Sequence, residues 1–151
     1  MELTLGLTLP RDELSIPIAR HICRDALNEV GVEPDCRSDI EIALTEACTN
    51  VLEHSGPGDE YRIDVTVDGE LCVIRVVDTG HGFDSASLAD MTGDLVSEGG
   101  RGVFLMRALV DRIEFISKPE AGTVVHLEKT LELRDDGPAA QLLRRKDGSA
   151  G

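Results

Sequence analysis

Glu46 and Asn50 form a pair of side chains that suits proton transfer and metal binding. They lie four residues apart in a segment with helical periodicity, so both project from one side of a helix. A carboxylate there can accept a proton from an attacking hydroxyl. An amide oxygen there can bind Mg²⁺, which takes few protein ligands and otherwise keeps water and phosphate oxygens. The alternative is an ordinary solvated helix face, since Asp39 and Glu53 lie on the same side.

A second segment, Asp78 to Phe83, places an acid after an apolar run and adds two glycines. The acid can accept a hydrogen bond from an exocyclic amine such as that of adenine. Gly80 and Gly82 permit positive φ and a close approach of the backbone to a flat ring. The alternative is a tight turn capped by the aspartate. His81, between the glycines, is interpreted as an exposed turn residue in preference to a catalytic base.

A third segment, residues 99–103, clusters three glycines just ahead of an apolar helix. Its backbone amides and the helix N-terminus can bind an anion, and Arg101 can add a charge-assisted hydrogen bond to phosphate. A hinge is the alternative. The segment is no Walker loop, because no Gly-Lys-Ser/Thr follows, and no dinucleotide fingerprint, which must follow a strand directly within a βαβ unit. Each segment alone is weak evidence, but the three in this order predict one ATP pocket.

The bulk composition fits one compact domain of 151 residues with 41% hydrophobic content. A net charge of -14 repels nucleic acid and ATP alike, so a nucleotide needs local donors and a divalent cation. No stretch predicts a membrane span or a signal peptide, and we expect a cytoplasmic protein. The four cysteines form no CxxC pair, and no spacing is typical of a transition-metal site.

The first third of the chain predicts one strand and two helices. Leucines alternate from Glu2 to Leu9, as in a half-buried strand. A helix is expected to begin near Ser15 and to stop at Gly31. A second helix opens at Pro34 and ends near His54–Gly56. Its predicted core stripe consists of Ile40, Leu44, Ala47 and Val51.

The remainder predicts two hairpins around a loop and a helix. Strands are expected over 61–67 and 71–77, joined by a two-residue Asp68-Gly69 turn, and the second is apolar enough to be buried on both faces. Residues 84–98 lack a period and predict a loop, followed by a helix over 103–111. Strands over 113–117 and 123–131 form the second hairpin. Residues 133–151 lack a core stripe and are expected to be a disordered or loosely helical tail.

This order predicts an α/β two-layer sandwich with one domain over residues 1–132. The hairpins favour a mixed, mostly antiparallel sheet, with the helices covering one face. A doubly wound parallel sheet is not expected, because regular βαβ alternation is missing.

With these motifs in place, the chain resembles the GHKL (Bergerat-fold) ATPases, and within them the bacterial anti-sigma-factor serine/threonine kinases. Residues 39–50 with His54 are similar to the family's N box, 78–83 to its G1 box and 100–103 to its G2 box. The resemblance implies that Glu46 is the catalytic base and that Asn50 binds Mg²⁺. The nucleotide-binding residues that it implies are Asn50, Asp78, Gly80, Gly82, Phe83, Gly100, Arg101, Gly102, Val103 and Thr123.

The resemblance also implies a function. A family member of this kind transfers a phosphoryl group from Mg-ATP to a serine or threonine of a small antagonist protein, and it sequesters a sigma factor, as a homodimer. An alternative is a non-catalytic ATP-binding module whose nucleotide state sets partner affinity, because residues 84–98 contain no Lys or Arg. A third hypothesis, an ATP-driven conformational machine, is disfavoured because one small domain leaves nothing to be driven. The sensor histidine kinases are a poor match, since no phosphoacceptor-histidine helix precedes the pocket.

Overall fold

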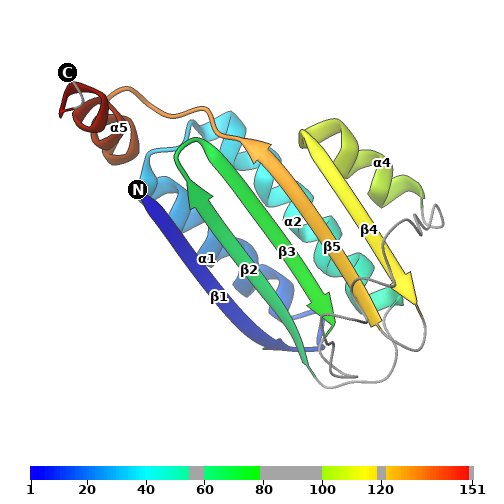
Figure 1. Ribbon diagram of the computed structural model, residues 1–151. Helices are drawn as coiled ribbons and strands as arrows, with labels where there is room; N and C mark the ends of the chain where they lie inside the picture. Colours follow the sequence, from blue (N-terminus) through cyan, green and yellow to red (C-terminus); the bar gives the residue numbers. More distant parts are fainter. Residues whose placement is uncertain (55–59, 79–99, 119–121, 150–151) are drawn as a thin grey trace.

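The computed structural model describes residues 1–54, 60–78, 100–118 and 122–149. Its centre is a five-stranded sheet in the order β1-β2-β3-β5-β4 (Figure 1). The strands are β1 (Glu2–Pro10), β2 (Glu60–Asp68), β3 (Leu71–Asp78), β4 (Arg112–Lys118) and β5 (Gly122–Thr130). The four described pairings are all antiparallel, which confirms the mostly antiparallel sheet predicted from the sequence.

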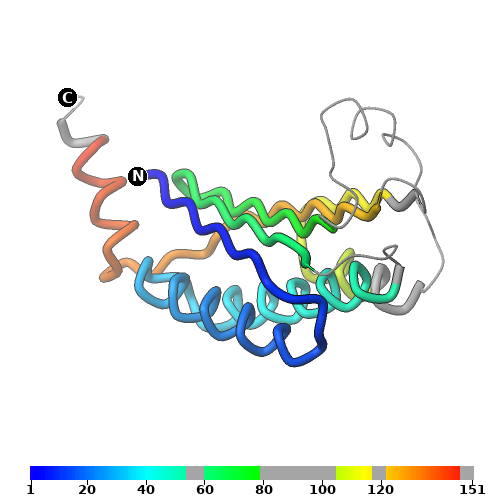
Figure 2. The backbone as a smooth tube through the Cα atoms, turned by 90° about the horizontal axis from the view of Figure 1, so that it is seen from below, coloured from blue at the N-terminus to red at the C-terminus, as the bar shows by residue number. Residues whose placement is uncertain are grey.

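Three helices cover one face of this sheet. They are α1 (Ser15–Val30), α2 (Pro34–His54) and α4 (Gly100–Leu109). Figure 2 shows the sheet as one layer and the helices as the other, so the predicted two-layer sandwich is confirmed. None of the described helices combines the length and the apolar character that a membrane crossing requires.

The core lies between these two layers. The strands alternate between inward apolar and outward polar side chains, and the register aligns the inward ones across the sheet. One such row consists of Leu7, Ile63, Val76, Val125 and Phe115. The helices contribute the apolar stripes that were predicted from residue spacing, for example the buried residues Ala19, Cys23 and Leu27 of α1.

The prediction that β3 is buried on both faces is wrong. Its inward residues are buried, but on the other face Arg75 is exposed and Val73 and Val77 are only half-buried. The strand is central in the order of the sheet, yet none of the described helices covers its outer face (Figure 2). Its apolar run therefore reflects the β-propensity of valine as well as burial.

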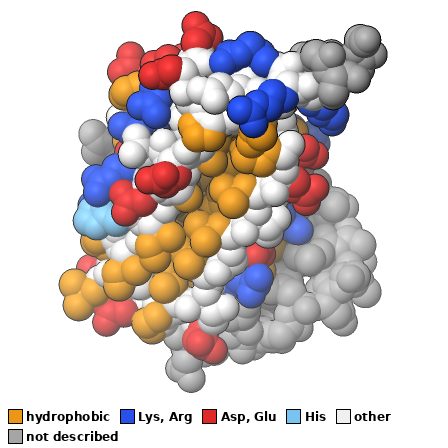
Figure 3. All heavy atoms as spheres, turned by 90° about the vertical axis from the view of Figure 1, so that its left-hand side faces the viewer, with side chains coloured by type: hydrophobic (Ala, Val, Ile, Leu, Met, Phe, Trp, Pro, Cys, Tyr) orange, Lys and Arg blue, Asp and Glu red, His pale blue; other side chains and the backbone are white. Residues whose placement is uncertain are grey.

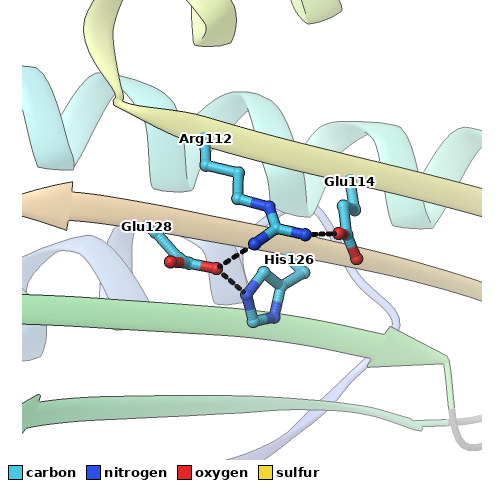
Figure 4. A network of polar contacts seen from close by, with 4 residues as sticks. All are labelled: Arg112, Glu114, His126 and Glu128. Carbon is cyan, nitrogen blue, oxygen red and sulfur yellow. Dashed lines mark hydrogen bonds and ion pairs between the residues drawn. The ribbon is translucent and has the colours of Figure 1, made fainter.

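The outer face of the sheet carries a network of charged side chains (Figure 4). His126 Nε2 lies 2.9 Å from Glu128 Oε2 on β5, and Arg112 NH1 of β4 lies 3.7 Å from the same oxygen. Arg112 also pairs with Glu114. Ion pairs on a solvent-facing surface of this kind contribute little to stability.

The C-terminal segment forms a helix, α5 (Pro138–Ser149), where the sequence favoured a disordered or loosely helical tail. The segment that leads into α5 is held against the end of α1 at Gly31, whose carbonyl accepts a hydrogen bond from the Arg134 amide at 2.7 Å. Ala139, in the first turn of α5, is buried. The domain boundary at residue 132 stays a prediction.

Gly31 must be glycine for two reasons that can be separated by mutation. It has φ +98°, and a Cβ there would lie 2.9 Å from the Gly137 Cα, whereas Gly69 has φ +60° with nothing within 4 Å. Gly31→Ala should therefore lower the free energy of unfolding by at least about 1 kcal/mol more than Gly69→Ala, because it adds overpacking to the left-handed strain. Urea unfolding of both variants measures this difference. Equal losses would show that the contact with Gly137 carries no constraint.

Candidate functional site

Three polar side chains lie fully buried in one row at the end of the sheet. Tyr61 of β2 pairs directly with Asp78 of β3. Val77 and Val124 form the last described pair of the β3–β5 ladder, so Asp78 and Thr123 follow as the next residues, side by side on the helix-covered face. All three are buried. The structure thus brings together the predicted adenine-binding residues Asp78 and Thr123.

Tyr61 is a supporting residue that sequence reasoning missed. Its hydroxyl lies 2.6 Å from Ser15 Oγ, and Ser15 Oγ donates its hydrogen to the Asp12 carbonyl at 2.6 Å. Tyr61 is therefore the donor to Ser15. Burial raises the pKa of Tyr61 to about 12, so the phenol stays protonated at neutral pH. This chain of hydrogen bonds fixes the start of α1 beside the strand that flanks Asp78. An inward tyrosine in an aliphatic strand was the only signal for it.

Glu46 and Asn50 lie next to the core stripe of α2, a helix that packs against both α1 and α4. Asn50 is only 4% exposed, and its Nδ2 has no hydrogen-bond partner within the described parts of the chain. A buried amide left without a partner costs about 1–3 kcal/mol. The amide NH2 therefore has unused donor capacity, which fits a group that donates to a phosphate oxygen or to water. Glu46, half-buried one turn earlier, keeps access to solvent.

The third predicted segment lies at the start of α4. The helix begins at Gly100, so Arg101, Gly102 and Val103 lie in its first turn. In the following turn the side chain of Met106 is fully buried in the core. The side chains of residues 100–104 and of His54 lie outside the described part of the structure, as do the predicted residues Gly80, Gly82 and Phe83 altogether.

Glu46 also lines a groove on the outer side of α2. This groove of about 320 Å³ lies between α1 and α2 and is lined by Arg20, Ser38, Glu41, Ile42, Thr45 and Glu46. A second groove of about 470 Å³ shares Thr45 and extends toward Arg11 and Glu53. Glu46 thus lies one helical turn from the buried Asn50 and also lines an open surface groove.

The cysteines offer no nucleophile. All four are buried as free thiols. Burial raises the pKa values of Cys23, Cys48 and Cys72 to about 12. Because the thiolate is the reactive form, these side chains act as small core residues at neutral pH.

The protein family described as the histidine kinase-like ATPase domain matches residues 9–129. The chain belongs to this family. The matched region runs from the end of β1 to the end of β5 and contains every described residue of the candidate site.

Individual proteins similar to this chain indicate a more specific relationship within the family. The serine-protein kinase RsbW of Halalkalibacterium halodurans is 30% identical over 142 residues, which span 88% of this chain and 86% of the relative. The serine-protein kinase RsbW of Bacillus licheniformis is 32% identical over 127 residues, 76% of this chain and 78% of the relative. The predicted resemblance to GHKL anti-sigma-factor kinases is therefore confirmed.

A solved structure supports the fold. The RsbU and RsbW domains of Rv1364c from Mycobacterium tuberculosis match with a TM-score of 0.66 at 21% identity. The match covers 85% of this chain and 32% of that longer chain. The roles predicted for Glu46, Asn50, Asp78 and Thr123 stay predictions.

Asp78→Asn tests the adenine assignment. The substitution keeps the size of the side chain but replaces an acceptor by an amide, so the Kd for Mg-ATP should rise at least about tenfold. Isothermal titration calorimetry measures it, and a thermal unfolding curve verifies that the variant folds. Asp64→Asn, which alters a carboxylate paired with Arg62 on the opposite face, should leave the Kd unchanged. Equal affinity of Asp78→Asn and the unsubstituted chain would contradict the assignment.

Proposed function

We propose that this chain is an ATP-dependent protein serine/threonine kinase that acts as an anti-sigma factor. It phosphorylates a hydroxyl on a small antagonist protein and sequesters a sigma factor in the cytoplasm. Its kinship with the RsbW serine-protein kinases supports this function. The observation that carries the proposal is the placement of Glu46 between the buried Asn50 and the open α1–α2 groove. A base in that position can meet both a nucleotide and a protein acceptor.

The purine would be held at the end of the sheet. Asp78 would accept a hydrogen bond from the adenine amine, and Thr123 beside it would supply a hydroxyl to the same ring. Tyr61 and Ser15 hold this end of the sheet in place. Because the row is buried, these hydrogen bonds form away from competing water.

The phosphates would lie between α2 and α4. Asn50 would be the protein ligand of Mg²⁺, and the amides at the start of α4 would donate to phosphate oxygens. When bound, Mg²⁺ would neutralise charge on the phosphates. Glu46 would accept the proton of the acceptor hydroxyl and orient it for in-line attack. Positioning and charge neutralisation supply most of the acceleration in such transfers.

The acceptor would approach through the α1–α2 groove. Glu46 lines this groove together with Arg20 of α1, which offers a positive charge in a strongly acidic chain. The exposed Ile42 adds an apolar contact. The groove therefore suits a segment of the antagonist that combines an apolar residue with an acidic one beside its hydroxyl.

A second copy of the chain would pair along β1 and α1. Leu14, at the N-cap of α1, and Ile18 and Ile22 on the helix are 77%, 52% and 37% exposed and follow one another at intervals of four residues. Figure 3 shows hydrophobic side chains gathered in a band on this edge of the molecule, where the half-buried leucines of β1 also lie. β1 carries a single charged residue, Glu2, whereas the whole chain has net charge -14. The strand itself therefore adds little charge repulsion between two copies.

Glu46→Gln separates catalysis from binding. With radiolabelled ATP, Mg²⁺ and the cognate antagonist, label transfer should fall at least about 100-fold, while Mg-ATP affinity should change little. Asp35→Asn, in the first turn of the same helix, should keep full transfer. Undiminished transfer in Glu46→Gln would contradict the assignment. If the unsubstituted chain transfers no label but binds the sigma factor in a nucleotide-dependent way, the non-catalytic module is correct instead.

Ile18→Glu tests the dimer. A charge in the middle of the α1 stripe should convert the protein to a monomer in sedimentation velocity experiments, because it would bury an unpaired carboxylate in the interface. Ile42→Glu, at an isoleucine of α2 that is 43% exposed, should stay dimeric. A monomeric unsubstituted chain, or an Ile18→Glu variant that remains a dimer, would rule out this interface.

A further inference from the structure

Lys129 is a cation on the helix-covered face of the sheet. It follows Val125 and Leu127 at inward positions of β5, and Leu131 after it is buried. Its side chain is only 19% exposed. Lysine is rarely buried to this extent unless its charge is paired. The contacts of its ammonium group must therefore account for a charged residue in an otherwise apolar row.

The ammonium group of Lys129 joins two helices. Its Nζ donates a 2.7 Å hydrogen bond to the carbonyl of Leu109, the last residue of α4. The same atom lies 3.7 Å from Asp39 Oδ2 on α2. A positive charge at a helix C-terminus interacts favourably with the helix dipole, so both contacts stabilise the same position of the ammonium.

A second contact holds this end of α4. The Asp111 amide donates to the Glu128 carbonyl at 2.9 Å, and the Asp111 carboxylate accepts a hydrogen bond from the Thr130 amide. That hydrogen bond holds the pKa of Asp111 below its usual range. The C-terminal end of α4 is thus anchored to β5, while its N-terminal end starts at Gly100 in the candidate phosphate site.

The anchor acts at a distance from that site. A ten-residue helix is about 15 Å long. If the helix tilts about its anchored end at Leu109, the atoms of Gly100 at the other end therefore move farther than those near the anchor. On α2, Asp39 precedes Glu46 by seven residues and Asn50 by eleven, which places all three on one side of the helix. Lys129 therefore ties the wall that carries Glu46 and Asn50 to the wall that carries the glycines.

We infer that Lys129 is a positioning residue that sets the separation of α2 and α4 and thereby the fit of the site to a triphosphate. This inference rests on the proposed nucleotide function. Adenine would be held elsewhere, by Asp78 and Thr123. Thr123 lies six residues from Lys129 along β5, or about 20 Å. Loss of the lysine should therefore affect phosphate binding and leave purine binding unchanged.

The test compares Mg-ATP with adenosine. In Lys129→Met, which keeps the aliphatic stem, the Kd for Mg-ATP should rise about tenfold, equivalent to 1.4 kcal/mol, while the Kd for adenosine should stay within about twofold. Isothermal titration calorimetry of the full chain measures both. Asp39→Asn should move the ratio of the two Kd values in the same direction, and Lys129→Arg should restore part of it. Arg112→Met, which removes a cation from the outer face of the same hairpin, should leave the ratio unchanged.

Two results would overturn the inference. If both Kd values rise in equal proportion in Lys129→Met and Asp39→Asn, or if neither changes, the lysine serves stability alone. Asp39→Asn keeps the test decisive even if Lys129→Met does not fold, because Asp39 lies on a partly exposed helix surface. An unsubstituted chain that binds neither ligand would overturn the proposed function together with this inference. Normal binding by the unsubstituted chain with an unchanged ratio in the variants would overturn the inference alone.

Discussion

A sheet with one covered face has to bury every inward side chain, and polar groups placed there are costly unless they find hydrogen-bonding partners. Most inward positions of this sheet are apolar, as that constraint demands. One end of the sheet is an exception. There Tyr61, Asp78 and Thr123 form a fully buried polar row, and Asn50 lies buried on α2. The candidate site is therefore the place where burial and polarity coincide, and the apolar remainder of the core keeps that end in register.

The two ends of the molecule have different roles. At the site end, the hydrogen bonds from Tyr61 through Ser15 to the Asp12 carbonyl fix the β1–α1 connection beside the pocket. At the opposite end, Lys129 and Asp111 fasten α4 to β5. Between them α2 runs the length of the sheet and carries Glu46 and Asn50 toward the site. In the proposed function, adenine, phosphate and acceptor would therefore have separate supports, so that each could be altered without disturbing the others.

The sequence predicted the elements well where periodicity and turn residues agree, as in the leucine alternation of β1 and the glycine that ends α1. It failed on the outer face of β3, because an apolar run does not reveal whether a second layer exists. The neighbouring positions of Asp78 and Thr123 depend on strand register across a long connection, which local pattern does not encode. Tyr61 and Lys129 were missed for a related reason, since their partners are distant in sequence.

The most direct test is a crystal structure with Mg²⁺ and a non-hydrolysable ATP analogue. The account predicts that the Asp78 carboxylate accepts a hydrogen bond from the adenine amine and that Asn50 Oδ1 coordinates the metal, with the phosphates at the start of α4. An analogue bound away from Asp78, or a metal held without Asn50, would contradict it.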